Sequence, residues 1–241
     1  MTVTAAQRLP DPWEGCALWR IDLGVAPAPS DLASLDVQER ARAARFVFED
    51  DRRRYQAAHA AMRALLAQAT GQGEPSTLRF VHNDFGKPSL ADAPGCHFSL
   101  SHSGDAALLA IDAVAPVGVD VEIERAMDDI DAMAQAHFTD AERDALQSAA
   151  HGARTGTFLR TWTRKEACLK AIGIGLSVDP RQLETARAGA PDEAWLDDAT
   201  HGARPLHLRS GRLAPDLLYS VASTRLLRPA PEASYSAEAL A

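Results

Sequence analysis

Two carboxylates in the segment VGVDVEIE, residues 117–124, are spaced so that they could hold a metal ion. The segment alternates apolar and polar residues, which is typical of a strand, so Asp120 and Glu122 leave the same face. Carboxylates this close repel each other, and a divalent cation would relieve that repulsion; oxygen ligands suit Mg²⁺ or Mn²⁺. The alternative is a strand whose polar face is simply exposed to solvent.

A predicted helix supplies a third carboxylate and two lysines. In TWTRKEACLKAIG, residues 161–173, Glu166 and Lys170 share one helix face. Such a pair is ordinarily a surface ion pair that contributes about 0.2–0.5 kcal/mol, but Lys165 falls within the apolar stripe of this helix. The two segments together predict three carboxylates on one cation with lysines close by for a phosphate, since carboxylates and substrate phosphates commonly hold Mg²⁺.

Two further segments add hydrogen-bond donors and a cation. FSLSHSGD, residues 98–105, predicts a strand that puts Ser101 and His102 near a turn, where they could donate to a phosphate; a structural role for His102 is the alternative. Lys87 closes the turn signal NDFGKP. The sequence has no GxSxG elbow, no P-loop and no GxGxxG, so it gives no support to a serine hydrolase, a P-loop site or a Rossmann site.

The elements that must position these groups come in two rounds of strands and helices, which predicts an α+β fold. The expected elements are, in order, a strand over 16–23, helices over 37–48 and 49–71, a strand over 77–82, three strands within 96–124, a helix from Thr139, a helix over 157–172, and weak strands beyond residue 179. The helix from Thr139 begins at a capping box that ends in Glu142.

Composition excludes several classes of protein. The net charge of −8 disfavours a nucleic-acid or membrane partner. Cys16, Cys96 and Cys168 are far apart and odd in number, which argues against a disulfide framework or a zinc site. Because no apolar run is long enough for a signal peptide or a membrane span, a cytoplasmic location is expected.

Five motifs, taken in order, resemble those of the larger, Sfp-like 4′-phosphopantetheinyl transferases. They are ARAARF (41–46), FGKP (85–88), FSLSHSGD (98–105), GVDVE (118–122) and WTRKEACLKAIGIGL (162–176). The resemblance implies a monomer of two similar α+β halves related by a pseudo-twofold axis. It implies an N-terminal half over residues 1–115, a C-terminal half with the metal site over 116–228, and a mobile tail over 229–241.

The resemblance also implies an activity and residue roles. The enzyme would use Mg²⁺ to transfer 4′-phosphopantetheine from coenzyme A to a serine of an apo acyl, polyketide or peptidyl carrier protein, releasing adenosine 3′,5′-bisphosphate. By the family's pattern, Asp120, Glu122 and Glu166 hold Mg²⁺ (Mn²⁺ is the alternative). Lys170 contacts the pyrophosphate, and Glu166 or a water accepts the proton of the serine.

The nucleotide end of coenzyme A would be held by basic and hydroxyl side chains. On the family's pattern these are Arg54, Lys87, Ser101 and His102. Family members often have lysines upstream of ARAARF, whereas this chain has Glu39 among arginines, so Arg40 and Arg42 are the candidates to replace them.

Two other readings stay open at this point. A module that binds coenzyme A or a carrier protein without transfer would keep Lys87, His102 and Arg54 but would not need three carboxylates converging on a metal. A Mg²⁺ nuclease of the E-x-K kind needs Glu and Lys two apart on a strand, unlike Glu166 and Lys170, and the net charge disfavours it. Residues 126–138 combine Met127, Ile130 and Met133 at helical spacing, which predicts either a carrier-docking patch or an ordinary core helix.

Overall fold

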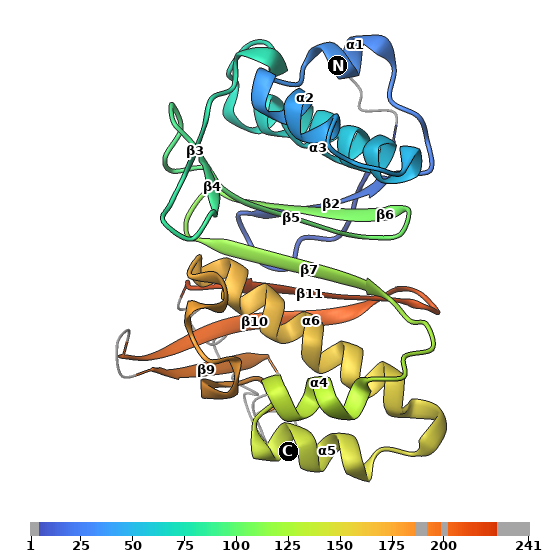
Figure 1. Ribbon diagram of the computed structural model, residues 1–241. Coiled ribbons are helices and arrows are strands. Elements are labelled where there is room, and N and C mark those ends of the chain that lie inside the picture. The colour runs from blue at the N-terminus through green and yellow to red at the C-terminus, as the bar shows by residue number, and fades with distance from the viewer. Residues whose placement is uncertain (1–4, 187–191, 199–201, 226–241) are drawn as a thin grey trace, which may run out of the picture.

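The computed structural model describes residues 5–186, 192–198 and 202–225 (Figure 1). Helices and antiparallel strands are mixed along the chain, which confirms the predicted α+β class. The tail predicted to be mobile, residues 229–241, lies outside the described residues. No helix within the described ranges is long and apolar enough to cross a membrane.

The first sheet is built from the N-terminal part of the chain. Its strands are antiparallel and lie in the order β1 (Ala6–Arg8), β2 (Cys16–Asp22), β6 (Ala106–Asp112) and β5 (His97–Ser103). Three helices accompany it: α1 (Pro29–Ala33), α2 (Val37–Ala43) and α3 (Glu49–Thr70). A hairpin of β3 (Phe80–His82) and β4 (Pro88–Leu90) stands apart as a two-stranded sheet after the 3₁₀ turn η1 (Pro75–Thr77).

The second sheet is built from the C-terminal part. Its strand order is β7 (Val117–Ile123), β11 (Leu217–Ser223), β10 (Gly202–Ala214), β9 (Glu193–Asp198) and β8 (Leu183–Glu184). Its helices are α4 (Ile130–His137), α5 (Asp140–Ser148) and α6 (Arg154–Ile172), with 3₁₀ turns η2 (His151–Ala153), η3 (Gly175–Ser177) and η4 (Pro180–Gln182). The boundary of the two halves and their pseudo-twofold relation stay predictions.

The elements stack as helices, sheet, sheet and helices (Figure 1). Strand β6 shows the reason, because every residue in it is buried. Leu109 and its alternate neighbours pack toward α3, while Leu108 and its alternate neighbours join Val119 and Val121 of β7 in a core between the sheets. A strand buried on both faces reads as a continuous apolar run, and AALLAID is one.

Tertiary packing moved several expected boundaries. The helix expected over 37–48 ends at Ala43, because Phe46 leaves the helix and packs its ring 5.4 Å from that of Tyr55 in α3. Helix α6 begins at Arg154, ahead of the expected residue 157. The helix expected from Thr139 is confirmed as α5, whose Thr139 side chain accepts from the Glu142 amide at 3.2 Å.

Helix α6 lies against strand β7 with almost no space between their backbones. A Cβ on Gly118 would come within 2.0 Å of the Ala167 carbonyl oxygen and 2.4 Å of the Ala171 nitrogen. Since Asp120 and Glu122 share the face of Gly118, this approach brings them next to the side chains of α6. The glycine therefore sets how close the two parts of the predicted site can come.

Candidate active site

The acidic face of β7 meets the polar face of α6. Lys170 of α6 donates from Nζ to Asp120 Oδ1 at 2.6 Å, and Asp120 is only 4% exposed. Burial raises the pKa of Glu166, and Asp120 and Glu122 raise it further, whereas Lys170 opposes them. Lys170 is therefore in contact with Asp120, and Glu166 lies close enough to Lys170, Asp120 and Glu122 for their charges to change its pKa.

Strand β5 orients the carboxylates through its serines. Ser101 Oγ donates to Asp120 Oδ1 at 2.7 Å, and Ser103 Oγ donates to Glu122 Oε2 at 2.7 Å. Ser99 Oγ accepts from the Val119 amide at 3.1 Å. The three serines of FSLSHS thus join β5 to β7 where no backbone ladder does. In the structure Ser101 supports the carboxylate site and also accepts a hydrogen bond from Lys170 Nζ at 3.1 Å, while its contact to the nucleotide stays a prediction.

The site carries more negative charge than its own residues compensate. Asp120 Oδ2 is buried and has no hydrogen-bond partner in this structure, which is costly unless another group pairs with it. Burial also raises the pKa of Glu122, to which Asp120 adds. Within the described ranges, no three His, Cys, Asp or Glu side chains already converge closely enough to hold an ion, and the Lys170 ammonium lies against Asp120.

Lys165 faces away from this site. Its ammonium is 2.7 Å from Glu142 Oε2 and donates to the Pro180 carbonyl at 2.8 Å, with both charged side chains almost fully buried. The expectation of a second lysine beside the phosphate, drawn from its place on the apolar stripe, is therefore wrong for Lys165. Its stripe position is instead explained by a buried ion pair that ties α6 to α5 and η4.

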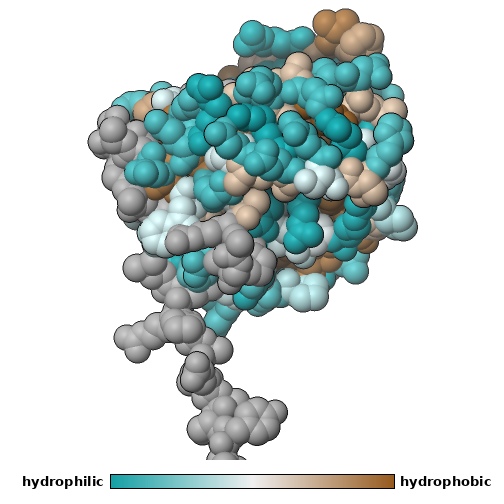
Figure 2. Space-filling model, turned by 90° about the horizontal axis from the view of Figure 1, so that it is seen from below, coloured by the Kyte–Doolittle hydropathy of each residue, from teal (hydrophilic) through white to brown (hydrophobic). Residues whose placement is uncertain are grey.

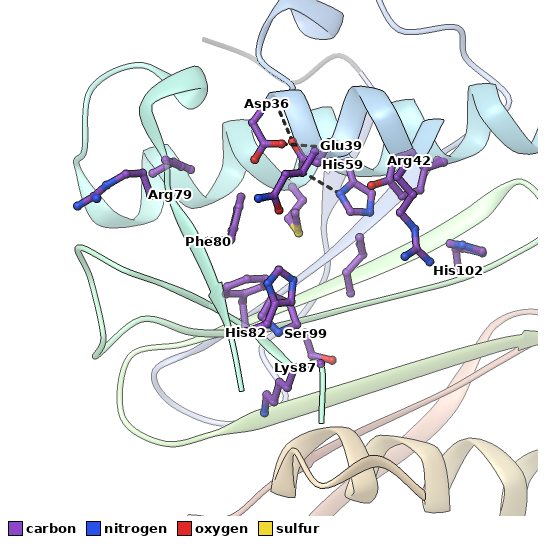
Figure 3. Close-up of a pocket in the computed structure, with 18 of the residues that line it drawn as sticks. Asp36, Glu39, Arg42, His59, Arg79, Phe80, His82, Lys87, Ser99 and His102 are labelled. Atoms are coloured by element: carbon purple, nitrogen blue, oxygen red, sulfur yellow. Dashed lines mark hydrogen bonds and ion pairs between the residues drawn. The ribbon is translucent and has the colours of Figure 1, made fainter. Parts of the chain in front are cut away.

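A cavity of about 1390 Å³ runs from Glu166 and Lys170 to α2 and α3. Figure 3 shows side chains of α2 and α3 on one side and of the hairpin and β5 on the other. Its basic lining residues are Arg42, Arg45, His59, Arg79, His82, Lys87, His102 and Lys170. The cavity therefore suits a polyanionic ligand despite the negative net charge of the chain.

Of the residues predicted to contact the nucleotide, His102 and Lys87 line the cavity and Arg54 does not. His102 lines the cavity, and partial burial lowers its pKa, with Lys170 adding to the effect. Lys87 also lines it, but its ammonium donates to the Val117 and Ala171 carbonyls at 3.2 and 3.0 Å. Arg54 is not among the lining residues; it pairs with Asp105 at 2.8 Å.

Sequence reasoning missed one group of lining residues on α3. His59 lines the cavity, stacks on Tyr55 with ring centroids 4.0 Å apart, and bonds through Nδ1 to Glu39 Oε1 at 3.0 Å (Figure 3). Arg63, fully buried, holds Glu39 at 2.6 Å. Tyr55 and His59 are four residues apart and so share one helix face, and this spacing could have indicated the pair from the sequence.

The predicted docking patch on α4 is largely core. Ile130 is buried, and Met127 and Met133 are half-buried against a cluster that includes Phe138 and Phe158. The face on which α4 and α5 lie, seen from below in Figure 2, is mostly hydrophilic with scattered apolar residues. Of the two readings, ordinary helix packing accounts for this segment.

Two family models match consecutive parts of the chain. Residues 29–114 match the N-terminal region of the 4′-phosphopantetheinyl transferases, and residues 116–213 match the 4′-phosphopantetheinyl transferase superfamily. The junction falls between β6 and β7, where the chain passes from the first sheet to the second.

Known proteins with similar sequences carry the same description. The 4′-phosphopantetheinyl transferase HetI of Nostoc is 36% identical over 75% of this chain and 83% of its own length. The transferase psf-1 of Bacillus pumilus is 32% identical over 69% of each chain. Sfp of Bacillus subtilis is 28% identical over 61% of this chain and 64% of its own, so the match spans less than two thirds of Sfp. The two family models and the similarity to HetI, together with Glu166 and Lys170 at one end of a basic cavity, show that the chain belongs to the 4′-phosphopantetheinyl transferase superfamily, a family of transferases.

Proposed function

We propose that this protein transfers 4′-phosphopantetheine from coenzyme A to a serine of an apo acyl, polyketide or peptidyl carrier protein, with release of adenosine 3′,5′-bisphosphate. The observation that carries the proposal is that Glu166 and Lys170 line one end of a basic cavity, where Lys170 pairs with Asp120 and Glu166 is electrostatically coupled to Asp120 and Glu122. A module that only binds coenzyme A has no need of this acidic cluster. The proposal includes a monomer in the cytoplasm, without nucleic-acid or membrane partners.

Asp120, Glu122 and Glu166 are the residues that would hold Mg²⁺, or Mn²⁺. The unpartnered Asp120 Oδ2 and the raised pKa values of Glu122 and Glu166 fit a cation, because all three are oxygen donors with charge left to neutralise. When bound, the ion would neutralise charge on the pyrophosphate oxygens. Lys170 lines the cavity from the same site, where its ammonium would contact the pyrophosphate, and Glu166 or a water would accept the serine proton.

A pH and Mg²⁺ dependence of stability follows from the two raised pKa values. Because Glu122 and Glu166 have folded-state pKa values above 4.5, the folded protein binds more protons than the unfolded chain in the window above 4.5. Their contribution to the free energy of unfolding therefore falls as pH rises through that window. Mg²⁺ binding to the folded state offsets this loss near neutral pH.

Urea unfolding with Mg²⁺ or with a chelator, at about pH 5 and about pH 7.5, measures this effect. The reference is the double variant Glu122→Gln/Glu166→Gln, which lacks both carboxylates and so isolates their contribution. We expect Mg²⁺ to raise the wild-type midpoint at the higher pH and to leave the double variant unchanged. Equal Mg²⁺ effects on the two proteins contradict the assignment.

The nucleotide end needs a cation where family members often have lysines, and Arg42 fits that place better than Arg40. Arg42 lines the cavity and lies over the Tyr55 ring at 5.9 Å. Arg40 does not line it, and its guanidinium donates to the Leu35 carbonyl. We therefore propose Arg42 as the contact to the 3′-phosphate of coenzyme A.

Arg42→Met is expected to raise the KM for coenzyme A by at least about tenfold, since a charge-assisted hydrogen bond contributes about 1.5–3 kcal/mol. Steady-state kinetics with coenzyme A and with 3′-dephospho-coenzyme A measures the effect, which should be confined to the phosphorylated substrate. Arg40→Met is the matched control, with an expected change below about twofold. A larger loss in Arg40→Met reverses the assignment.

The function itself is tested by the intact mass of apo carrier proteins after incubation with this protein, coenzyme A and Mg²⁺. A mass gain equal to phosphopantetheine, lost with a chelator and accompanied by adenosine 3′,5′-bisphosphate, is the expected result. Acyl, polyketide and peptidyl carriers are each assayed. No gain on any of them, with coenzyme A still bound, supports the binding module instead.

A further inference from the structure

The turn of the β3–β4 hairpin is closed by its own asparagine. Asn83 Oδ1 accepts from the Phe85 amide at 3.0 Å and from the Lys87 amide at 2.8 Å. The Asn83 amide also donates to the Lys87 carbonyl at 3.1 Å. These hydrogen bonds hold residues 83–87 in one tight turn. The side chains of Asn83 and Lys87 extend from this turn on the same side.

Both side chains of this unit reach across to the end of α6. Asn83 Nδ2 donates to the Gly173 carbonyl at 2.7 Å, and Lys87 Nζ donates to the Ala171 carbonyl at 3.0 Å and the Val117 carbonyl at 3.2 Å. The last carbonyls of a helix have no partner within the helix, and a cation beside them is favoured by the helix dipole. We call this set of contacts, from Asn83 and Lys87 to the end of α6, the clasp.

The Lys87 side chain packs directly against the Cα of Gly173, where a larger residue would not fit. Gly173 has a φ of +80°, and a Cβ there would come within 2.8 Å of Lys87 Cδ. The chain has only three lysines, Lys87, Lys165 and Lys170, and in the structure each donates from Nζ to partly or fully buried oxygens. A compact ammonium suits such sites better than the planar guanidinium that the chain uses elsewhere.

Among the described residues, no acidic side chain explains the position of the Lys87 ammonium. Lys87 has no carboxylate partner among the residues that the structure describes, and burial alone lowers its pKa to about 8. Its side chain stands in the wall between the large cavity and a smaller one of about 200 Å³, so both cavities depend on where it lies.

We propose that Lys87 and Asn83 are positioning residues, which hold the Phe85–Pro88 wall of the cavity against α6, and that the Lys87 ammonium does not contact the phosphates of coenzyme A. The inference rests on the proposed function for its ligand, but the clasp itself does not. It replaces the nucleotide contact that the sequence resemblance implied for Lys87. Loss of either residue weakens every ligand that uses this wall, whether or not the ligand carries a 3′-phosphate.

The test compares Lys87→Met with Asn83→Asp, which keeps the Oδ acceptor of the turn and removes the Nδ2 donor to Gly173. Dissociation constants for coenzyme A and 3′-dephospho-coenzyme A are measured by calorimetry, and kcat is measured with an apo carrier. Both variants should bind both ligands about tenfold more weakly, with the same factor for each ligand, and kcat should change less than about twofold. Arg42→Met supplies the contrasting pattern, in which only coenzyme A is weakened.

Amide hydrogen exchange gives a readout that needs no ligand. Residues 83–88 should exchange faster in both clasp variants than in the wild type, while the α3 amides should stay protected. A loss confined to coenzyme A in Lys87→Met, or unchanged affinity for both ligands, overturns the proposal. If the wild type neither binds coenzyme A nor modifies a carrier, the proposed function fails, and the exchange rates alone then decide on the clasp.

Discussion

Asp120→Asn is expected to lower kcat/KM for carrier modification by at least about a thousandfold, which corresponds to about 4 kcal/mol of transition-state stabilisation. The side chain keeps its size but loses the charge that the site needs. Asp120 is the carboxylate on which the site converges, because its Oδ1 receives both Ser101 and Lys170 and its Oδ2 is buried without a partner.

The matched control is Glu124→Gln. Glu124 directly follows the last residue of β7 and continues the alternation of Asp120 and Glu122. Glu124 pairs with Arg212 at 2.7 Å in a partly exposed contact, outside the cavity lining. Exposed pairs of this kind contribute little, so its kcat/KM should stay within about threefold of the wild type. Thermal unfolding of both variants separates loss of the site from loss of the fold.

An Asp120→Asn protein that modifies its carrier at more than about a tenth of the wild-type rate contradicts the assignment of the metal site. Calorimetry of coenzyme A binding, with a chelator or with Mg²⁺, then shows whether the lost activity comes from lost Mg²⁺ binding. We expect the variant to retain its affinity for coenzyme A in the presence of a chelator, because the basic lining of the cavity is intact. Mg²⁺ should no longer strengthen that affinity.

Gly118→Ala is the change with the largest expected effect on the fold. The new Cβ would lie 2.0 Å from the Ala167 oxygen, 2.4 Å from the Ala171 nitrogen and 2.9 Å from the Lys170 carbonyl carbon, all of them backbone atoms of α6. No side chain can move to relieve this, so α6 must shift away from β7. We expect a loss of at least about 3 kcal/mol and a Tm lower by roughly 6–12 °C.

The same shift should remove activity in whatever fraction stays folded, because Glu166 and Lys170 travel with α6. Gly152→Ala is the control: nothing lies within 4 Å of a Cβ at that position. Calorimetric unfolding and carrier modification are measured on both variants. A Gly118→Ala protein with wild-type Tm and activity shows that the backbone contact between β7 and α6 is not required.

The residue pattern alone was enough to predict which side chains share a face and which elements carry them. Alternation along VGVDVEIE placed Asp120 and Glu122 on one face, and helical spacing placed Glu166 and Lys170 on another, because period 2 and period 3.6 are local properties of the backbone. The same alternation put Ser99, Ser101 and Ser103 on one side of β5, where the structure has them.

The partner that each side chain contacts depends on how the elements pack, which the sequence pattern does not give. Lys87 and Lys165 looked like phosphate ligands from their motifs, yet one donates to carbonyls at the end of α6 and the other pairs with Glu142. Arg40 and Arg42 were equal candidates in the sequence, but the packing of α2 leaves Arg42 in the cavity lining and Arg40 on the Leu35 carbonyl. Spacing fixes the face from which a side chain leaves, but the element that packs against that face decides what the side chain does, and the carbonyl partner it supplies lies 84 residues away for Lys87 and 15 for Lys165.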